Sequence, residues 1–153
     1  MDFYQIIMAI QNKLYLTQTD TTLGFVSQDA SKIDRAKRRL PNKHYIRTVN
    51  SFALLQSFGR VPQKHKNWVR RAKRTTFIMP NGRSFRVVRG SAHNLLLDRV
   101  GWFYSSSANL SGEGYDAVYA REQCEVLVAS PLSGRGESSR IYRLGFDRVV
   151  AVR

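Results

Sequence analysis

The stretch Ser105-Ser106-Ser107-Ala108-Asn109-Leu110-Ser111-Gly112 directly follows the apolar run 100–104. A strand-like segment that stops in hydroxyls, an amide and a glycine presents hydrogen-bonding groups to a ligand. Thr19-Asp20-Thr21-Thr22-Leu23-Gly24 has the same character and follows another apolar run, 14–16. A Lys/Arg cluster lies between the two segments, so together they predict a pocket for a small, polar, negatively charged ligand.

Length and charge limit the class of protein. The 153 residues suit one domain with a real core, and we expect a single domain over 1–153. The 25 Lys and Arg against 11 Asp and Glu give a net charge of +14, which favours nucleic acid, nucleotides or an anionic surface as partners. No apolar run approaches the ~20 residues of a membrane span and no signal segment is visible, so we expect a cytoplasmic protein without a membrane partner.

Helical and extended segments alternate along the chain. Helices are expected at 2–12, 29–38, 52–57, 62–74, 95–100 and 115–123, and strands at 14–17, 24–27, 44–49, 75–79, 84–88, 102–105, 125–129, 140–144 and 149–152. Asn81-Gly82 between two of these strands predicts a hairpin. The Gly- and Ser-rich stretch 130–139 is expected to be a mobile loop. The pattern predicts an α/β fold with a mixed sheet.

Two basic clusters are candidate anion sites. The first lies at the end of the helix expected at 29–38, where Lys37 and Arg39 can point the same way and Lys43 follows. A solvated helix end, favoured by the helix dipole, is the alternative. The second cluster surrounds Trp68, which either stacks on a base or anchors its helix to the core. Its cations are Lys64, Lys66, Arg70, Arg71, Lys73 and Arg74.

Several familiar chemistries do not fit the sequence. Cys124 is the single cysteine, and His44, His65 and His93 are scattered without a carboxylate at ligand spacing, so we expect no protein-built metal site. Neither a Gly-x-Ser-x-Gly elbow nor a Gly-rich phosphate loop is present. The remaining hydroxyls, amides and cations suit nucleotidyl transfer, which depends on positioning and charge neutralisation.

In this order the segments resemble the YrdC-like family of threonylcarbamoyl-adenylate synthases. The resemblance is carried by the segment 18–24, by Lys37-Arg38-Arg39-Leu40 with Lys43-His44-Tyr45, and by Phe85-Arg86-Val87-Val88. The most specific motif is 106–112, and Ser138-Ser139-Arg140-Ile141 with Arg153 completes the series. The motifs are collinear and extend over essentially the whole chain.

The resemblance implies a twisted mixed β-sheet curved around a basic groove, with helices outside. It implies a nucleotidyltransferase that joins L-threonine, bicarbonate and ATP into threonylcarbamoyl-AMP and pyrophosphate, with Mg²⁺ accompanying ATP. The product serves tRNA modification, so tRNA or tRNA-modification proteins are implied partners. The implied catalytic residues are Lys37, Arg39, Ser107 and Asn109; those for ATP are Lys37, Arg39, Lys43, Asn109, Ser139 and Arg153; those for threonine are Thr21, Arg86 and Ser107.

The chain departs from the family pattern around the implied threonine pocket. Gln18 and Leu23 replace a proline and a tyrosine, and Thr48 stands where a histidine is usual. Two alternatives therefore stay open beside the synthase: a non-catalytic RNA-binding relative, which the net charge favours, and an enzyme of the same chemistry that uses another amino acid.

Overall fold

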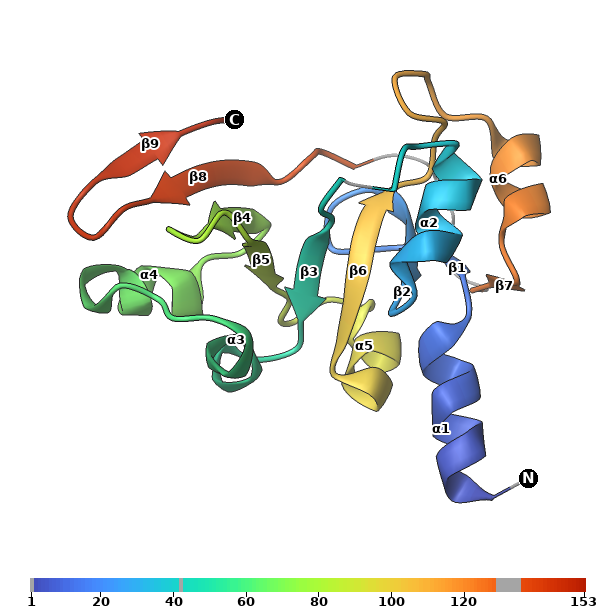
Figure 1. Cartoon of the computed structure of the whole chain (residues 1–153), viewed down its shortest axis with the longest axis horizontal. Coiled ribbons are helices and arrows are strands. Elements are labelled where there is room, and N and C mark those ends of the chain that lie inside the picture. The colour runs from blue at the N-terminus through green and yellow to red at the C-terminus, as the bar shows by residue number, and fades with distance from the viewer. Residues whose placement is uncertain (1, 42, 129–135) are drawn as a thin grey trace.

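The computed structural model of the chain describes residues 2–41, 43–128 and 136–153, which form a nine-stranded mixed sheet with helices (Figure 1). The strands lie in the order β7-β1-β2-β6-β3-β5-β4-β8-β9. Pairing is parallel for β1/β7, β3/β5 and β4/β8 and antiparallel for the other neighbours. The predicted α/β class with a mixed sheet is confirmed. The strands are β1 (Tyr15–Gln18), β2 (Leu23–Ser27), β3 (Ile46–Val49), β4 (Thr75–Ile78), β5 (Ser84–Val87), β6 (Trp102–Ser107), β7 (Val126–Leu127), β8 (Arg140–Leu144) and β9 (Val149–Ala151).

Four of the six α-helices in the described chain begin at a short polar side chain that caps them. Asp2 forms a capping box with Gln5, and Asp29, Ser51 and Asp116 each accept a hydrogen bond from a backbone N–H in the first turn of their helix. The helices are α1 (Phe3–Asn12), α2 (Ala30–Lys37), α3 (Phe52–Phe58), α4 (Lys66–Arg71), α5 (Asn94–Val100) and α6 (Ala117–Gln123), with a 3₁₀ turn, η1 (Gln63–His65), before α4.

The predicted helix over 62–74 is the largest local error. The segment instead forms η1 and the short α4, and the helix ends at Ala72, whose backbone is extended. Arg74 then takes a left-handed conformation with φ 54°, which redirects the chain into β4. Elsewhere β6 runs two residues beyond its predicted end, to Ser107. Most of the loop predicted over 130–139 lies outside the described residues.

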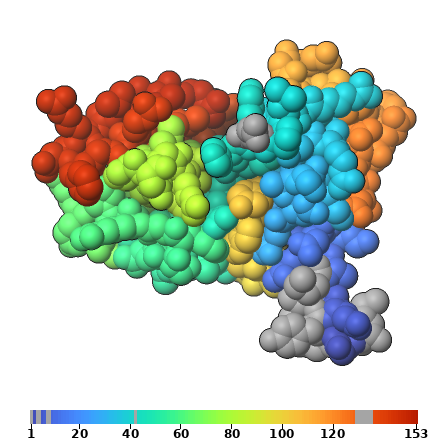
Figure 2. All heavy atoms as spheres, in the orientation of Figure 1, coloured from blue at the N-terminus to red at the C-terminus, as the bar shows by residue number. Residues whose placement is uncertain are grey.

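Different helices cover the two faces of the sheet. On β6, Phe103 packs with Val26 and Leu97 in a cluster on the face covered by α5. The neighbouring residues Trp102 and Tyr104 belong to clusters on the opposite face, under α3 with α4 and under α2 with α6 respectively. Figure 2 shows α1 projecting from the body of the molecule at the end away from the β8–β9 hairpin.

Beyond Phe103 the face covered by α5 becomes polar. Ser105 and Ser107 follow Phe103 at alternate positions of β6, and Thr48 and Arg86 are register partners on β3 and β5. Gly24 lies opposite Ser107 on β2, and a Cβ added there would come within 2.9 Å of the Ser106 carbonyl oxygen. Glycine therefore lets the two polar strand ends approach closely.

Candidate functional site

The polar end of this face holds a cavity of about 240 Å³. It is lined by groups from both halves of the chain. Six residues that the sequence singles out are among them, namely Thr21, Arg39, Arg86, Ser107, Ser139 and Arg153. The two polar strand ends, 19–24 and 105–112, therefore lie at one site, as the sequence predicts.

Lys37 is not among the residues that line the cavity, but it contacts Ser107, which does. Its side chain is 1% exposed, and Nζ donates to the carbonyl oxygens of Ser107 and Asn109, at 2.8 Å each, and to Asn109 Oδ1 at 3.3 Å. The three ammonium protons are thus used inside the protein. Burial, with a smaller contribution from Arg39, lowers the pKa of Lys37 to about 8, so the group keeps its charge at neutral pH.

Asn109 is the centre of the same network. Its Oδ1 accepts from Lys37 and from the Ser107 hydroxyl, and its Nδ2 donates to the carbonyl oxygens of Leu110 and Glu113. The amide oxygen is thus occupied by Lys37 of α2 and Ser107 of β6, and the amide nitrogen by the loop that follows β6. Lys37 and Asn109, which are distant in sequence, are in direct contact, and together they fix the position of Ser107 at the rim of the cavity.

Arg39 reaches the cavity from the loop after α2. Its guanidinium carbon lies 5.4 Å from the centre of the Tyr45 ring, and the Tyr45 hydroxyl donates to Asp34 Oδ1 at 2.5 Å. Burial and this hydrogen bond raise the pKa of Tyr45. Arg39 Nε is buried without a hydrogen-bond partner in the described part of the chain. An unpartnered buried donor beside a cavity is a group that a ligand can satisfy.

Arg86 forms a buried ion pair with Asp20. Arg86 Nε lies 3.1 Å from both carboxylate oxygens, Nη2 lies 3.1 Å from Oδ1, and the side chains are 4% and 7% exposed. Nη1 also donates to Thr76 Oγ1 at 3.4 Å. The pair fixes the guanidinium beside the hydroxyl-bearing loop 19–22.

Ser139 and Arg153 close the cavity from the C-terminal segment. The Ser139 hydroxyl is 2.8 Å from Thr76 Oγ1, and its carbonyl oxygen accepts from Arg153 Nε at 3.0 Å. Ser139 is buried, whereas Arg153 is exposed. Lys43 is exposed and lines a different cavity, on the other face of the sheet.

The sequence analysis did not assign roles to three residues of this region. Asp20 is the partner of Arg86, and its place in the polar segment 19–24 was a usable signal. Thr76 joins Arg86 to Ser139, a link that follows only from the order of β5, β4 and β8. His93 is 3% exposed, and both ring nitrogens lack a hydrogen-bond partner in the described chain. Burial lowers the pKa of His93 to about 4, against the opposing effect of Asp20.

The described residues contain no group of three or more His, Cys, Asp or Glu side chains placed to hold a metal ion. They also contain no helix that is long and apolar enough to cross a membrane.

Solved structures with this fold include Sua5 and YciO. Sua5 of P. abyssi complexed with L-threonine superposes with a TM-score of 0.76 and is 19% identical, over 100% of this chain and 54% of that chain. YciO of E. coli gives a TM-score of 0.73 at 15% identity, over 98% of this chain and 88% of that chain. The nucleotide- and phosphate-bound HypF gives 0.74 at 13% identity, over 97% of this chain and 28% of that one. The fold expected from the resemblance is therefore confirmed.

Among curated proteins, the chain is similar to uncharacterised proteins of two mycoplasmas. The protein from Mycoplasma pneumoniae is 29% identical over an alignment of 141 residues that covers 86% of this chain and 30% of the relative. The protein from Mycoplasma genitalium is 25% identical over 150 residues. The chain thus spans less than a third of the length of these relatives. No protein-family model matches it.

Proposed function

We propose that the chain is an L-threonylcarbamoyladenylate synthase, which forms threonylcarbamoyl-AMP and pyrophosphate from L-threonine, bicarbonate and ATP. The observation that carries this proposal is one cavity lined by three guanidinium groups, of Arg39, Arg86 and Arg153, and by hydroxyls from both halves of the chain. Cations suit a triphosphate and a carboxylate, and hydroxyls suit an amino acid with its own hydroxyl. A fold shared with a Sua5 that binds L-threonine supports the same reading.

Threonine is assigned to the part of the cavity around Arg86, Thr21 and Ser107. Arg86 is the group for the substrate carboxylate, because Asp20 occupies Nε and one edge of the guanidinium but leaves donors on Nη1 and Nη2. The Thr21 and Ser107 hydroxyls then face the side chain or amine of the substrate.

The ATP phosphates are assigned to Arg39 and Arg153, with Ser139 beside them. Arg39 Nε is the donor that lacks a protein partner. Lys37 and Asn109 act as positioning residues, because their polar groups are occupied by each other and by the loop that carries Ser107. Lys43 does not line this cavity in the structure, since it lies on the cavity of the opposite face. It contacts ATP only if its exposed side chain moves to the candidate active site.

In the first step of the proposed reaction the amine of threonine forms a bond to the carbon of bicarbonate, a C–O bond of bicarbonate breaks and water leaves, which gives a carbamate. The carbamate oxygen attacks the α-phosphorus of ATP, the bond to the β-phosphate oxygen breaks, and pyrophosphate leaves with the electron pair. Guanidinium groups around the phosphates offset the crowding of anions and stabilise the charge that moves to the leaving group. Mg²⁺ enters this proposal as the ion that accompanies ATP.

A second candidate, RNA binding without synthesis, is favoured by the exposed cations of the η1–α4 region. Lys64, Arg70, Arg71, Lys73 and Arg74 are exposed. Trp68 is partly exposed, but its ring packs edge-on against Phe77 and Tyr142, 4.8 Å away in each case, as an anchor does. This candidate predicts RNA affinity that falls steeply with added salt, together with no binding of ATP in the cavity.

The test is pyrophosphate release from ATP, with threonine or bicarbonate omitted in turn. Synthesis predicts release that requires both, and Arg39→Ala is expected to lower kcat/KM by about ten- to a hundred-fold, the value of one charge-assisted hydrogen bond. Arg89→Ala, an exposed arginine that does not line the cavity, is the matched control. Release that continues without threonine but requires a different amino acid identifies the alternative substrate; release that needs neither threonine nor bicarbonate contradicts the proposal.

A further inference from the structure

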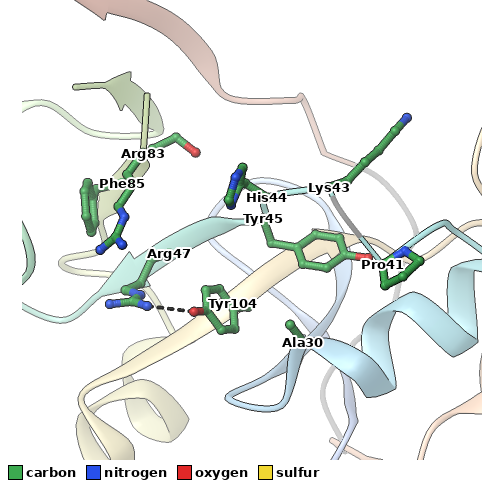
Figure 3. A pocket seen from close by; sticks show the side chains of 10 residues that line it. Ala30, Pro41, Lys43, His44, Tyr45, Arg47, Arg83, Phe85 and Tyr104 are labelled. Carbon is green, nitrogen blue, oxygen red and sulfur yellow. Dashed lines mark hydrogen bonds between the residues drawn. The ribbon is translucent and has the colours of Figure 1, made fainter. Parts of the chain in front are cut away.

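The opposite face of the sheet carries a second cavity, of about 330 Å³. In Figure 3, Arg83 and Phe85 lie on one side of it, Tyr45 and Pro41 on the other, and Arg47 bonds to Tyr104 between them. The volume is near the lower end of the range for small-molecule sites, about 300–1,000 Å³.

Strand alternation separates this cavity from the candidate active site. Arg47, Phe85 and Tyr104 line it, whereas their chain neighbours Ile46, Arg86 and Ser105 line the first cavity. Successive side chains of a strand point to opposite faces, so β3, β5 and β6 form the partition between the two. Only His44 and Tyr45, just before β3, line both cavities.

Arg47 is held in an aromatic cage. Its guanidinium carbon lies 4.1 Å from the centre of the Phe58 ring, 4.3 Å from the Trp102 ring and 5.0 Å from the Tyr104 ring, and Nη2 donates to the Tyr104 hydroxyl at 2.7 Å. Such contacts hold a guanidinium in one orientation without neutralising its charge. Its other N–H groups make no hydrogen bond in the described part of the chain.

The charge of this cavity is uncompensated. Lys43, His44, Arg47 and Arg83 line it, and no Asp or Glu does so among the described residues. The ion pairs of the described chain lie elsewhere, at Glu125 and at Asp20. The nearby carboxylate of Asp34 is bonded to the Tyr45 hydroxyl. A fixed guanidinium and an exposed one, with no protein anion between them, form a receptor for a ligand anion.

We propose that this second cavity binds a nucleoside monophosphate, either as a free nucleotide or as a unit of single-stranded RNA. Its phosphate lies between Arg47 and Arg83, with the imidazole of His44 within the same lining. The rings of Tyr45, Phe85 and Tyr104 provide the apolar wall for the base and sugar. The site does not depend on the synthase activity, since Arg47, Arg83, Phe85 and Tyr104 do not line the candidate active site, and His44 and Tyr45 are the two rings that both cavities share among the described residues.

Calorimetric titration of the full chain with AMP tests the proposal. Arg83 is exposed, so Arg83→Ala removes a ligand contact without disturbing the core; Arg47→Met removes the caged cation but keeps an apolar stem among the rings. Each is expected to weaken AMP binding by at least ten-fold. Arg89→Ala, the same change at an exposed arginine outside both cavities, is expected to leave it unchanged. Adenosine, which lacks the phosphate, is expected to bind at least ten-fold more weakly than AMP.

Arg39→Ala distinguishes this site from the candidate active site, because it removes a cation from that cavity alone. AMP binding that survives Arg39→Ala but not Arg83→Ala supports the second site. AMP binding that disappears in Arg39→Ala and persists in Arg83→Ala, or no AMP binding at all, overturns it. A short oligoadenylate that binds more tightly than AMP, with the same sensitivity to Arg83→Ala, identifies RNA as the source of the nucleotide. AMP that binds more tightly than the oligoadenylate identifies the free nucleotide.

Discussion

Lys37 ties the end of α2 to the loop after β6 through its charged side chain. Replacement by methionine keeps the stem but leaves the carbonyl oxygens of Ser107 and Asn109 without their donor. We expect Lys37→Met to destabilise the chain by about 1–3 kcal/mol and to loosen the loop, since unsatisfied buried acceptors carry this cost. Hydrogen exchange of the backbone amides at 107–113, with urea unfolding, measures both effects.

Lys32→Met on the same helix is the matched control. Lys32 pairs with Glu125 at the surface, at 2.6 Å, and a pair of this kind contributes less than about 1 kcal/mol. Amide exchange at 107–113 that is as slow in Lys37→Met as in Lys32→Met would show that Lys37 does not position the loop.

Removal of one partner of the buried Asp20–Arg86 pair is expected to destabilise the chain strongly. Replacement of both partners by apolar residues is expected to destabilise it less. Asp20→Asn leaves the Arg86 guanidinium buried without its counter-charge, and we expect a loss of about 3 kcal/mol in the free energy of unfolding. The double change Asp20→Leu with Arg86→Met removes both charges and is expected to be more stable than the single variant. Chemical denaturation of both variants checks this; a double variant less stable than Asp20→Asn would contradict it.

His93 gives the stability of the chain a specific dependence on pH. Its pKa is about 4 in the folded protein and ordinarily about 6.5, so between these values the unfolded chain binds more protons. Stability is therefore expected to fall as the pH drops from 6.5 towards 4, by up to about 3 kcal/mol in total. Urea unfolding across this range measures the slope.

The matched variant is His93→Leu, which has no titratable group. Its stability is expected to change less than that of the wild type over the same pH range. The same slope in both proteins would mean that other groups, such as the neighbouring Asp20, cause the pH dependence.

At the scale of elements, the β4–β5 hairpin depends on a glycine in a left-handed conformation. Gly82 has φ 85°, and an added Cβ would meet no atom within 4 Å. We expect Gly82→Ala to cost about 1 kcal/mol through backbone strain alone. Gly114→Ala is the control, because its surroundings are equally open but its φ is not positive. Thermal unfolding separates the two, and an equal melting temperature for both variants would contradict the prediction.

The elements were predictable wherever local chemistry decides them. Asp2, Asp29 and Ser51 mark helix starts in the sequence and act as caps in the structure, and Asn81-Gly82 forms the turn that its residues favour. The helix over 62–74 was predicted too long because its charged C-terminal half has no apolar stripe to hold it on the core. The missing stripe was already visible in the sequence, and a short charged segment without one is only marginally helical.

The site was only partly predictable. The polar strand ends and Arg39 were found from residue type and order, Arg86 and Arg153 from the family resemblance, and they line one cavity. The inward orientation of Lys37, the partnership of Asp20 with Arg86 and the link through Thr76 depend on strand order and side-chain direction. Lys43 was assigned to ATP, yet it lies on the second cavity, because the chain crosses to the other face just before β3.

At the scale of the whole molecule, basic side chains gather in three places among the described residues. Arginines line the candidate active site, four basic side chains line the second cavity, and the η1–α4 region is a basic surface. A net charge of +14 without matching acids concentrates anions around the protein. The sheet keeps the two cavities apart while sharing the segment of His44 and Tyr45 between them.

The proposed synthesis of threonylcarbamoyl-AMP is tested most directly by detecting this product. The purified chain is incubated with ATP, L-threonine and isotopically labelled bicarbonate, and the nucleotides are analysed by mass spectrometry. We expect threonylcarbamoyl-AMP carrying the labelled carbon in wild type and in Arg89→Ala, and much less of it in Arg39→Ala. Release of AMP or ADP without any labelled nucleotide, or a labelled product unaffected by Arg39→Ala, would contradict it.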